Sequence, residues 1–182
     1  MLSKRAMPSV FLHAPQDFHN LCLLVRTLEA FGHRRCFVFD PHHVVRERYG
    51  KVRSRELRAT SAGAFDKMTW VRVEQPAEHL SQHRGRVIAT VAAPNATSLC
   101  EHRFEPDDLL VFGSESCGLP PELVSQSDAA LTIPLLGETR SLNLAVSLGI
   151  VLFEMHRQLT AISDDPREIQ NAHRDFGKSP HR

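Results

Sequence analysis

Three segments of the chain carry side chains that could bind and orient a substrate. The first segment, 20–32, is predicted to be helical and contains Asn20 and Arg26. Six residues turn a helix through about 600°, so these two side chains are expected to lie about 120° apart around it. Taken alone, Arg26 is also typical of the exposed side of an amphipathic helix. The buried face would then come from Leu23, Leu24, Thr27, Leu28 and Phe31.

The second segment, 109–120, is an apolar strand that enters a loop bounded by Gly113 and Gly118. Glycines allow a ligand to approach the backbone closely. Glu115 adds a charge at the carboxyl end of the strand. A plain turn between a strand and a helix would explain the glycines equally well, but it gives no reason for the carboxylate.

The third segment, 131–143, is a strand that ends in a loop containing proline and glycine. Ser141 is expected to cap the long helix that follows, since serine and asparagine are good capping residues. Capping would explain Ser141 without any other role. A helix N-terminus also presents free N–H groups to a ligand, so Ser141 and Asn143 are both candidates for binding.

Apolar runs bounded by turn residues predict six strands, at 9–13, 36–40, 69–73, 87–91, 109–112 and 129–133. Helices are predicted at 17–31, 76–84, 120–126 and 141–159, with Asp17 capping the first and Gly32 ending it. The stretch 42–58 is predicted to be loop and short helix. This alternation predicts an α/β fold, a mostly parallel sheet flanked by helices on both faces. In such sheets the ligand lies beyond the carboxyl ends of the strands.

In order and spacing, the three segments resemble the motifs of the SpoU branch of the SPOUT superfamily, the RNA ribose 2′-O-methyltransferases. The matching residues are Asn20 and Arg26 in the first motif, Gly113, Glu115 and Gly118 in the second, and Ile133, Pro134, Ser141, Leu142 and Asn143 in the third. The resemblance covers residues 8–160 and includes 58–64, which is similar to a family segment between strands. Cys22 departs from it, because the first motif usually has a small residue, often glycine, at that position.

The resemblance implies a C-terminal deep trefoil knot, which no periodicity argument predicts because knots are rare. It implies S-adenosylmethionine as the methyl donor and requires no metal. The residues expected to bind the donor are Thr90, Gly113, Gly118, Ile133 and Leu142.

The resemblance also implies a homodimer, with helix 141–160 at the interface and the active site shared between subunits. The helix supports this expectation, because its apolar residues spread around it and one sheet face cannot cover them all. Val151 and Met155 are expected to lie in that interface.

Methylation of a ribose 2′-hydroxyl requires an in-line attack on a sulfonium methyl group, so positioning of the reactants is a large part of catalysis. Arginine is a poor proton acceptor because its pKa exceeds about 12. We therefore expect Arg26 to hold an RNA phosphate and stabilise the developing alkoxide. Asn20, Glu115, Ser141 and Asn143 are expected to orient Arg26 and the ribose.

The charge distribution is uneven along the chain. Residues 1–60 carry 11 Lys/Arg against 5 Asp/Glu, whereas 61–182 carry 11 against 16. The basic residues cluster at Arg46, Arg48, Lys51, Arg53, Arg55 and Arg58. This stretch is predicted to bind an RNA backbone, although a solvated helix face remains the alternative interpretation.

About eight residues precede the first strand, so the domain is expected to find RNA with its own surface. The expected substrate is then tRNA, the usual one for such compact members, with rRNA as the alternative. The requirement for a 2′-hydroxyl makes DNA an unexpected substrate.

Composition excludes several classes of protein. Apolar residues make up 42% and charged residues 24%, which excludes a collagen-like or wholly disordered chain. No apolar stretch reaches the roughly 20 residues of a membrane span. The N-terminus is basic but no apolar stretch of signal-peptide type follows it, so secretion is not expected. Four cysteines without a C-x-x-C pair predict free thiols in the cytoplasm and no zinc site.

The expected organisation is an N-terminal extension at 1–7, one methyltransferase domain at 8–160 and a polar, mobile tail at 161–182.

Three other functions stay open. A serine hydrolase could use Ser116, because 114–118 resembles a nucleophile elbow in which Ser114 replaces the first glycine, and Asp128 and His156 follow in the order of an α/β-hydrolase triad. Against it, His156 lies within a predicted helix rather than a loop. A catalytically silent knotted RNA-binding protein is disfavoured by the intact polar residues of the three motifs. An enzyme that methylates a base is disfavoured by the Ser-Leu-Asn run at 141–143.

Overall fold

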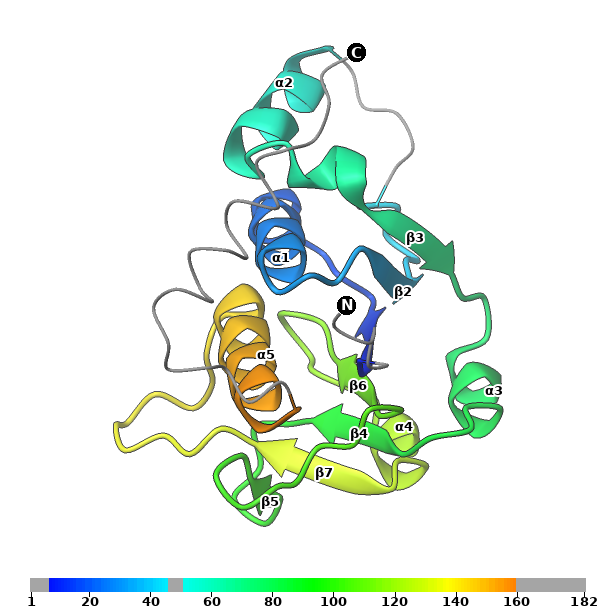
Figure 1. Ribbon diagram of the computed structural model, residues 1–182, viewed down its shortest axis with the longest axis vertical. Helices are drawn as coiled ribbons and strands as arrows, with labels where there is room; N and C mark the ends of the chain where they lie inside the picture. The colour runs from blue at the N-terminus through cyan, green and yellow to red at the C-terminus, as the bar shows by residue number, and fades with distance from the viewer. Residues whose placement is uncertain (1–6, 46–50, 160–182) are drawn as a thin grey trace, which may run out of the picture.

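The computed structural model describes residues 7–45 and 51–159. In that part of the chain, seven strands form one parallel sheet in the order β3-β2-β1-β6-β4-β7-β5 (Figure 1). The strands are β1 (Ser9–His13), β2 (Arg35–Phe39), β3 (Thr69–Arg72), β4 (Val87–Thr90), β5 (Thr97–Ser98), β6 (Leu109–Phe112) and β7 (Ala129–Thr132). The parallel α/β class predicted from the sequence is confirmed.

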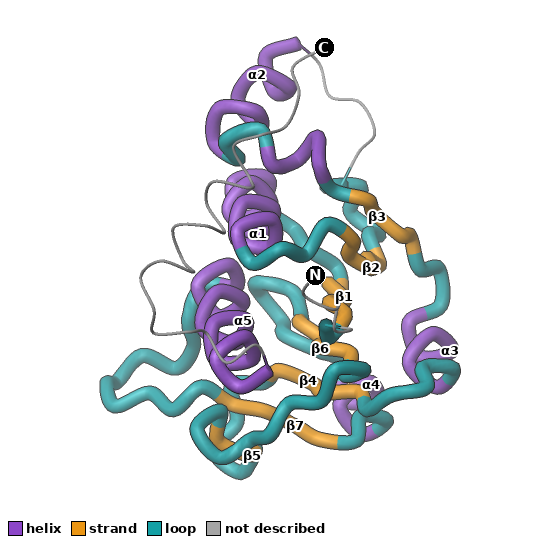
Figure 2. Tube along the Cα trace, viewed as in Figure 1, coloured by secondary structure: helices purple, strands orange, loops and turns teal. Residues whose placement is uncertain are grey.

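Helices cover both faces of the sheet (Figure 2). The helical elements are α1 (Phe18–Ala30), α2 (Lys51–Thr60), η1 (Ala64–Lys67, a 3₁₀ turn), α3 (Pro76–Ser81), α4 (Pro121–Ser125) and α5 (Leu144–Leu159), of which α2 packs on α1. Helices α1 and α5 lie side by side on one face, while the short α3 and α4 lie on the other (Figure 1). Side chains alternate along a strand, so β1 contributes to the cores on both faces of the sheet. Val10 and Leu12 join the core under α1 and α5, whereas Phe11 joins the core under α3 and α4.

The residues predicted to begin and end α1, Asp17 and Gly32, do so in the structure. The Asp17 carboxylate accepts a hydrogen bond from the Asn20 N–H at 2.7 Å, which makes Asp17 the N-cap. At the other end Gly32 adopts a φ of 78°, a left-handed conformation that favours glycine. The N–H groups of Gly32 and His33 bond back to the carbonyls of Glu29 and Leu28, which closes a Schellman motif.

Helix α5 begins three residues later than predicted. Its first residue is Leu144, and the Asn143 side-chain oxygen accepts hydrogen bonds from the N–H groups of Ala145 at 2.9 Å and Val146 at 3.4 Å. Asn143 is therefore the capping residue, and the prediction that Ser141 caps the helix is wrong. Either residue type can cap, so the sequence alone did not decide between them.

The exposed and buried faces of α1 and α5 also correct two predictions. Leu23 was expected in the core but is 45% exposed. Val151 and Met155 were expected at an interface but are buried inside the protomer, where they join the α1/α5 core. The apolar residues that α5 leaves exposed are Val146, Ile150 and Phe153.

Other differences are confined to short elements. The sequence missed the two-residue strand β5 and the 3₁₀ turn η1, and it extended α3 beyond its last residue, Ser81. The expected tail at 161–182 and residues 1–6 of the expected extension lie outside the described residues. The trefoil knot stays a prediction, because strand order alone does not test it.

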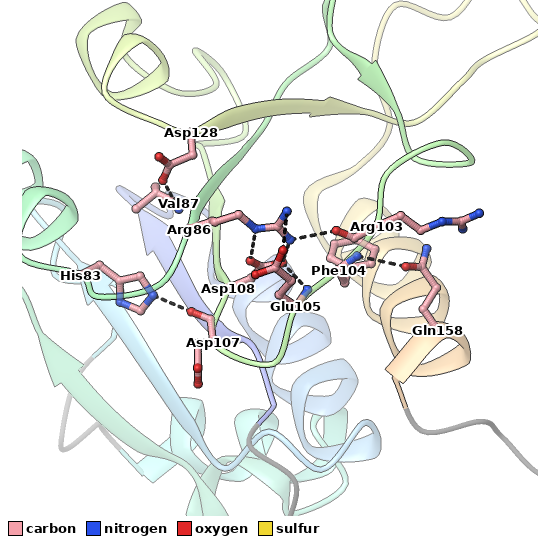
Figure 3. Close-up of polar contacts among 10 residues, drawn as sticks. All are labelled: His83, Arg86, Val87, Arg103, Phe104, Glu105, Asp107, Asp108, Asp128 and Gln158. Carbon is pink, nitrogen blue, oxygen red and sulfur yellow. Dashed lines mark hydrogen bonds and ion pairs between the residues drawn. The ribbon is translucent and has the colours of Figure 1, made fainter.

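A cluster of polar residues lies at the amino ends of β4 and β6 (Figure 3). The Arg86 guanidinium donates to both oxygens of the buried Asp108 carboxylate at 2.9 Å. It also donates to the Arg103 carbonyl at 2.8 Å, and the Glu105 N–H donates to Asp108 at 2.8 Å. Gln158 of α5 bonds to the backbone of the same loop, at the His102 carbonyl and the Phe104 N–H. The loop before β6 is thereby tied to both the sheet and α5.

Replacing Asp108 with asparagine should lower the free energy of unfolding by about 1–3 kcal/mol, because a buried charged hydrogen-bond acceptor is lost. Chemical denaturation measures this change. The matched control is Asp107→Asn, because Asp107 is exposed and its bond to His83 is made by the backbone carbonyl, which the substitution keeps. Equal stability of the two variants would contradict the structural role of the Asp108 carboxylate.

Candidate active site

A cavity of about 840 Å³ opens at the carboxyl ends of β4, β6 and β7. Its wall includes the strand-end residues Thr90, Phe112 and Thr132, together with parts of loops 113–119 and 133–142. All five residues predicted to bind the donor line it, namely Thr90, Gly113, Gly118, Ile133 and Leu142. The cavity thus lies where a parallel sheet is expected to bind its ligand.

One chain of hydrogen bonds joins the three sequence motifs beside this cavity. The Asn20 side-chain amide donates to Glu115 Oε1 at 3.3 Å. The Asn143 amide donates in turn to the Asn20 side-chain oxygen at 2.7 Å. Asn143 is also the cap of α5, so this chain of bonds fixes the start of that helix against α1. Three of the five predicted catalytic residues are therefore in direct contact.

Glu115 is held further by the backbone at the start of α1. Its carboxylate accepts from the N–H groups of Gln16 at 3.0 Å and Asp17 at 3.4 Å. A carboxylate is favourable at this position because the first N–H groups of a helix have no partner within it. The Ser116 hydroxyl adds a second link to this turn by donating to the Gln16 side-chain oxygen at 2.7 Å.

The sequence did not predict the contacts that Gln16 and Ser116 make with this site. Both residues are exposed and polar in loops, so neither carries a signal that separates it from other surface residues.

The other two predicted catalytic residues, Ser141 and Arg26, take no part in this chain of hydrogen bonds. Ser141 lines the cavity and is exposed. Arg26 is exposed on α1 and does not line the cavity. Among residues 7–45 and 51–159, no hydrogen bond or ion pair engages the Arg26 guanidinium. It is therefore available to a ligand that approaches from outside.

Gly113 lines the cavity and also has a structural reason to lack a side chain. A Cβ at this position would lie 2.1 Å from the Gly118 carbonyl carbon and 2.4 Å from the Leu119 nitrogen. The missing side chain thus makes room for the protein's own backbone, where Ser114 and Gly118 form an isolated bridge. Gly118 has a φ of 68°, which favours glycine at the turn.

Cys22, the departure from the first motif, packs α1 against α2. Its side chain is buried with Phe18 and with Leu57 of α2. Burial raises the pKa of the Cys22 thiol, and the carboxylates of Glu56 and Asp17 act in the same direction. The thiol is therefore protonated at neutral pH and behaves as an apolar packing group.

The predicted RNA-binding stretch is described only in part. Arg46 and Arg48 lie outside the described residues, while Lys51 and Arg53 belong to α2 without a described side chain. Arg55 and Arg58 are exposed on α2, and Arg58 pairs with Asp66 at 3.1 Å. The structure therefore places two of the six cations on an exposed helix surface.

The hydrolase triad is not assembled. Asp128 lies at the amino end of β7, where it accepts from the Val87 N–H at 2.7 Å. Ser116 lies in the loop after β6, beyond the carboxyl ends of the strands, where its hydroxyl donates to the Gln16 side-chain oxygen. His156 lies on α5, where its ring packs against Phe31 and His33. The three groups therefore belong to separate parts of the molecule.

Two further findings concern the described part of the chain. None of its helices has the length and apolar character needed to cross a membrane. No group of three or more His, Cys, Asp or Glu residues there is placed to hold a metal ion.

Comparison with known proteins gives consistent matches. The profile of the SpoU rRNA Methylase family matches residues 7–153. The tRNA (guanosine(18)-2′-O)-methyltransferase of Thermus thermophilus is 32% identical over 162 residues, which cover 86% of this chain and 77% of that protein. The chain spans 68% of the corresponding enzyme of Aquifex aeolicus and 60% of that of Escherichia coli.

Solved structures share the fold. One described as giving insights into 2′-hydroxyl methylation of C/U34 on tRNA has a TM-score of 0.73 and 31% identity, covering 86% of this chain and 99% of that one. An rRNA methyltransferase from Sinorhizobium meliloti, bound to S-adenosylmethionine, has a TM-score of 0.70 and 26% identity, covering 86% and 58%.

Replacing Gly113 with alanine should lower the free energy of unfolding by about 1–3 kcal/mol, because the added Cβ forces the Gly118 backbone away. Thermal and chemical denaturation measure this effect. Gly137→Ala is the matched control, since Gly137 also lines the cavity but a Cβ there meets nothing within 4 Å. A Gly113→Ala protein as stable as the control would contradict the close backbone approach.

Proposed function

The chain belongs to the SpoU rRNA methylase family, and we propose that it transfers a methyl group from S-adenosylmethionine to a ribose 2′-hydroxyl of RNA. The observation that carries this proposal is the cavity at the carboxyl ends of β4, β6 and β7, beside which Asn20, Glu115 and Asn143 form one hydrogen-bonded chain. Methyltransferases named for ribose 2′-O methylation of tRNA are among its relatives.

The cavity fits the donor in size and lining. Its volume of about 840 Å³ lies within the range of small-molecule sites. Leu119, Ile133, Leu142 and Leu144 offer apolar contacts for an adenine ring, while loop 113–119 brings backbone polar groups to the wall. Bound there, S-adenosylmethionine supplies a methyl group activated by a sulfonium.

The protein's own groups orient the acceptor. Arg26 binds an RNA phosphate beside the target ribose and stabilises negative charge as the hydroxyl loses its proton. Asn20, Glu115 and Asn143 fix α1 relative to α5, and Ser141 at the rim of the cavity contacts the ribose. Holding both reactants in line supplies about 7–11 kcal/mol of the barrier reduction.

The proposed substrate is tRNA. Support comes from two similar proteins named for tRNA, a structure concerned with C/U34 on tRNA and the guanosine-18 enzyme of Thermus thermophilus, which are 31% and 32% identical to this chain. Assays on tRNA transcripts, with the methylated nucleotide mapped by mass spectrometry, separate positions 18 and 34. Transfer to ribosomal RNA alone would support the rRNA alternative.

We place the enzyme in the cytoplasm, together with its substrate.

The basic stretch is proposed to bind the RNA backbone outside the cavity. Its residues are Arg46, Arg48, Lys51, Arg53, Arg55 and Arg58. Support comes from α2, which packs on α1 through Leu57 and Cys22 and presents Arg55 and Arg58 to solvent.

A homodimer is proposed from the apolar surface that α1 and α5 leave exposed. Leu23, Val146, Ile150 and Phe153 are between 36% and 54% exposed. On α5 they recur at spacings of four and three residues, which places them on one helix face. A second copy of the chain would remove this face from water.

Arg26→Ala should reduce methyl transfer at least about 100-fold, because the charge that stabilises the alkoxide is lost. Binding of S-adenosylhomocysteine, measured by calorimetry, should change less than about twofold, since Arg26 lies outside the cavity lining. Arg34→Ala is the control, an exposed arginine just before the amino end of β2. Turnover of the Arg26 variant close to that of the control would remove Arg26 from the mechanism.

Phe153→Asp should shift the protein from twice 20.5 kDa to 20.5 kDa in sedimentation experiments and should reduce methyl transfer. The reason is that a carboxylate on the exposed face of α5 would be buried without a partner in the dimer. Gln126→Asp, on the exposed surface beside α4, should leave the mass unchanged. A fully active 20.5 kDa species of the unmodified chain would contradict both the dimer and the shared site.

A further inference from the structure

The cavity carries very little charge. Among the described residues that line it, Glu115 is the only acidic residue and Arg140 the only basic one, while the others are apolar or neutral. One carboxylate and one guanidinium therefore set the electrostatic character of a site that is otherwise apolar. In such a site each charge is an important determinant of which ligand groups bind where.

These two charges differ in what they contact. Glu115 already accepts hydrogen bonds from the backbone of Gln16 and Asp17 and from the Asn20 amide. Arg140 lies in the loop between β7 and α5 and is exposed. Throughout residues 7–45 and 51–159, no hydrogen bond or ion pair engages its guanidinium. Glu115 is thus part of the framework, whereas Arg140 is a cation without a partner in the described part of the chain.

We propose that Arg140 binds the α-carboxylate of the methyl donor. This inference rests on the proposed function. The donor carries a positive sulfonium, a positive ammonium and one negative carboxylate, and Arg140 is the one basic residue among the described residues that line the cavity. A guanidinium matches a carboxylate with two parallel hydrogen bonds, which no other side chain of the described cavity lining provides.

An RNA phosphate is the competing anion for Arg140. The position of the residue favours the donor, because Arg140 belongs to the wall of the cavity whereas the exposed Arg26 does not. Arg140 also directly precedes Ser141 and Leu142, which line the same cavity. The two arginines are thereby divided between the two substrates, with Arg26 for the RNA and Arg140 for the amino-acid end of the donor.

The test compares two ligands that differ in the amino-acid end. S-adenosylhomocysteine has the α-carboxylate, whereas 5′-methylthioadenosine retains the adenosine and sulfur but has no carboxylate. Arg140→Gln should weaken calorimetric binding of S-adenosylhomocysteine by about 10- to 100-fold, the effect of losing a charged hydrogen-bond partner. Binding of 5′-methylthioadenosine should stay within about twofold.

Two variants complete the experiment. Arg84→Gln is the matched control, an exposed arginine before the amino end of β4, and it should bind both ligands as the unmodified protein does. Arg140→Lys keeps the charge without the paired donors, and it should bind S-adenosylhomocysteine with intermediate affinity.

Two results would overturn the inference while leaving the proposed function intact. One is an equal loss of affinity for both ligands in Arg140→Gln. The other is unchanged affinity for S-adenosylhomocysteine accompanied by weaker tRNA binding, which would assign the guanidinium to a phosphate. If the unmodified protein bound neither ligand, the proposed function would itself be overturned.

Discussion

The candidate site depends on the side chain of Asn20, which must donate and accept at the same time. Its amide donates to Glu115, and its oxygen accepts from Asn143. A carboxamide of this length performs both tasks, whereas an aspartate would place a second negative charge beside Glu115 and lose the donor. Through this one residue the loop after β6 and the start of α5 are held against α1, although they lie 95 and 123 residues away from it in sequence.

The parallel sheet brings the three partners into reach of one another. Strands β1, β6 and β4 are neighbours, and β7 pairs with β4, so the loops that leave their carboxyl ends emerge at one edge. The Asn143 cap then directs α5 back over the sheet beside α1 (Figure 1). The cavity is the space left between these loops, which supply most of its lining.

The amino and carboxyl ends of the strands are therefore chemically different. At the amino ends, Arg86 and the buried Asp108 bond to one another and to several backbone groups, and Gln158 ties α5 to the same loop (Figure 3). Beyond the carboxyl ends, Glu115 is satisfied by the residues at the start of α1, whereas Arg140 in the loop after β7 has no partner among the described residues. A polar cluster whose groups bond to one another within the protein stabilises the fold, whereas a cation on the cavity wall without such a partner is a candidate for binding an anionic ligand.

The sequence by itself predicted the six main strands to within one residue and the caps Asp17 and Gly32, and the family resemblance indicated five residues that line the cavity. These features depend on local periodicity, on capping chemistry and on motifs read in order. Tertiary structure alone decided that Asn143 rather than Ser141 caps α5, that Val151 and Met155 are buried, and that Gly113 makes room for Gly118. Each of these depends on which distant segment lies opposite the residue. Local pattern does not contain that information, because contacts across the sheet are set by strand order and by packing.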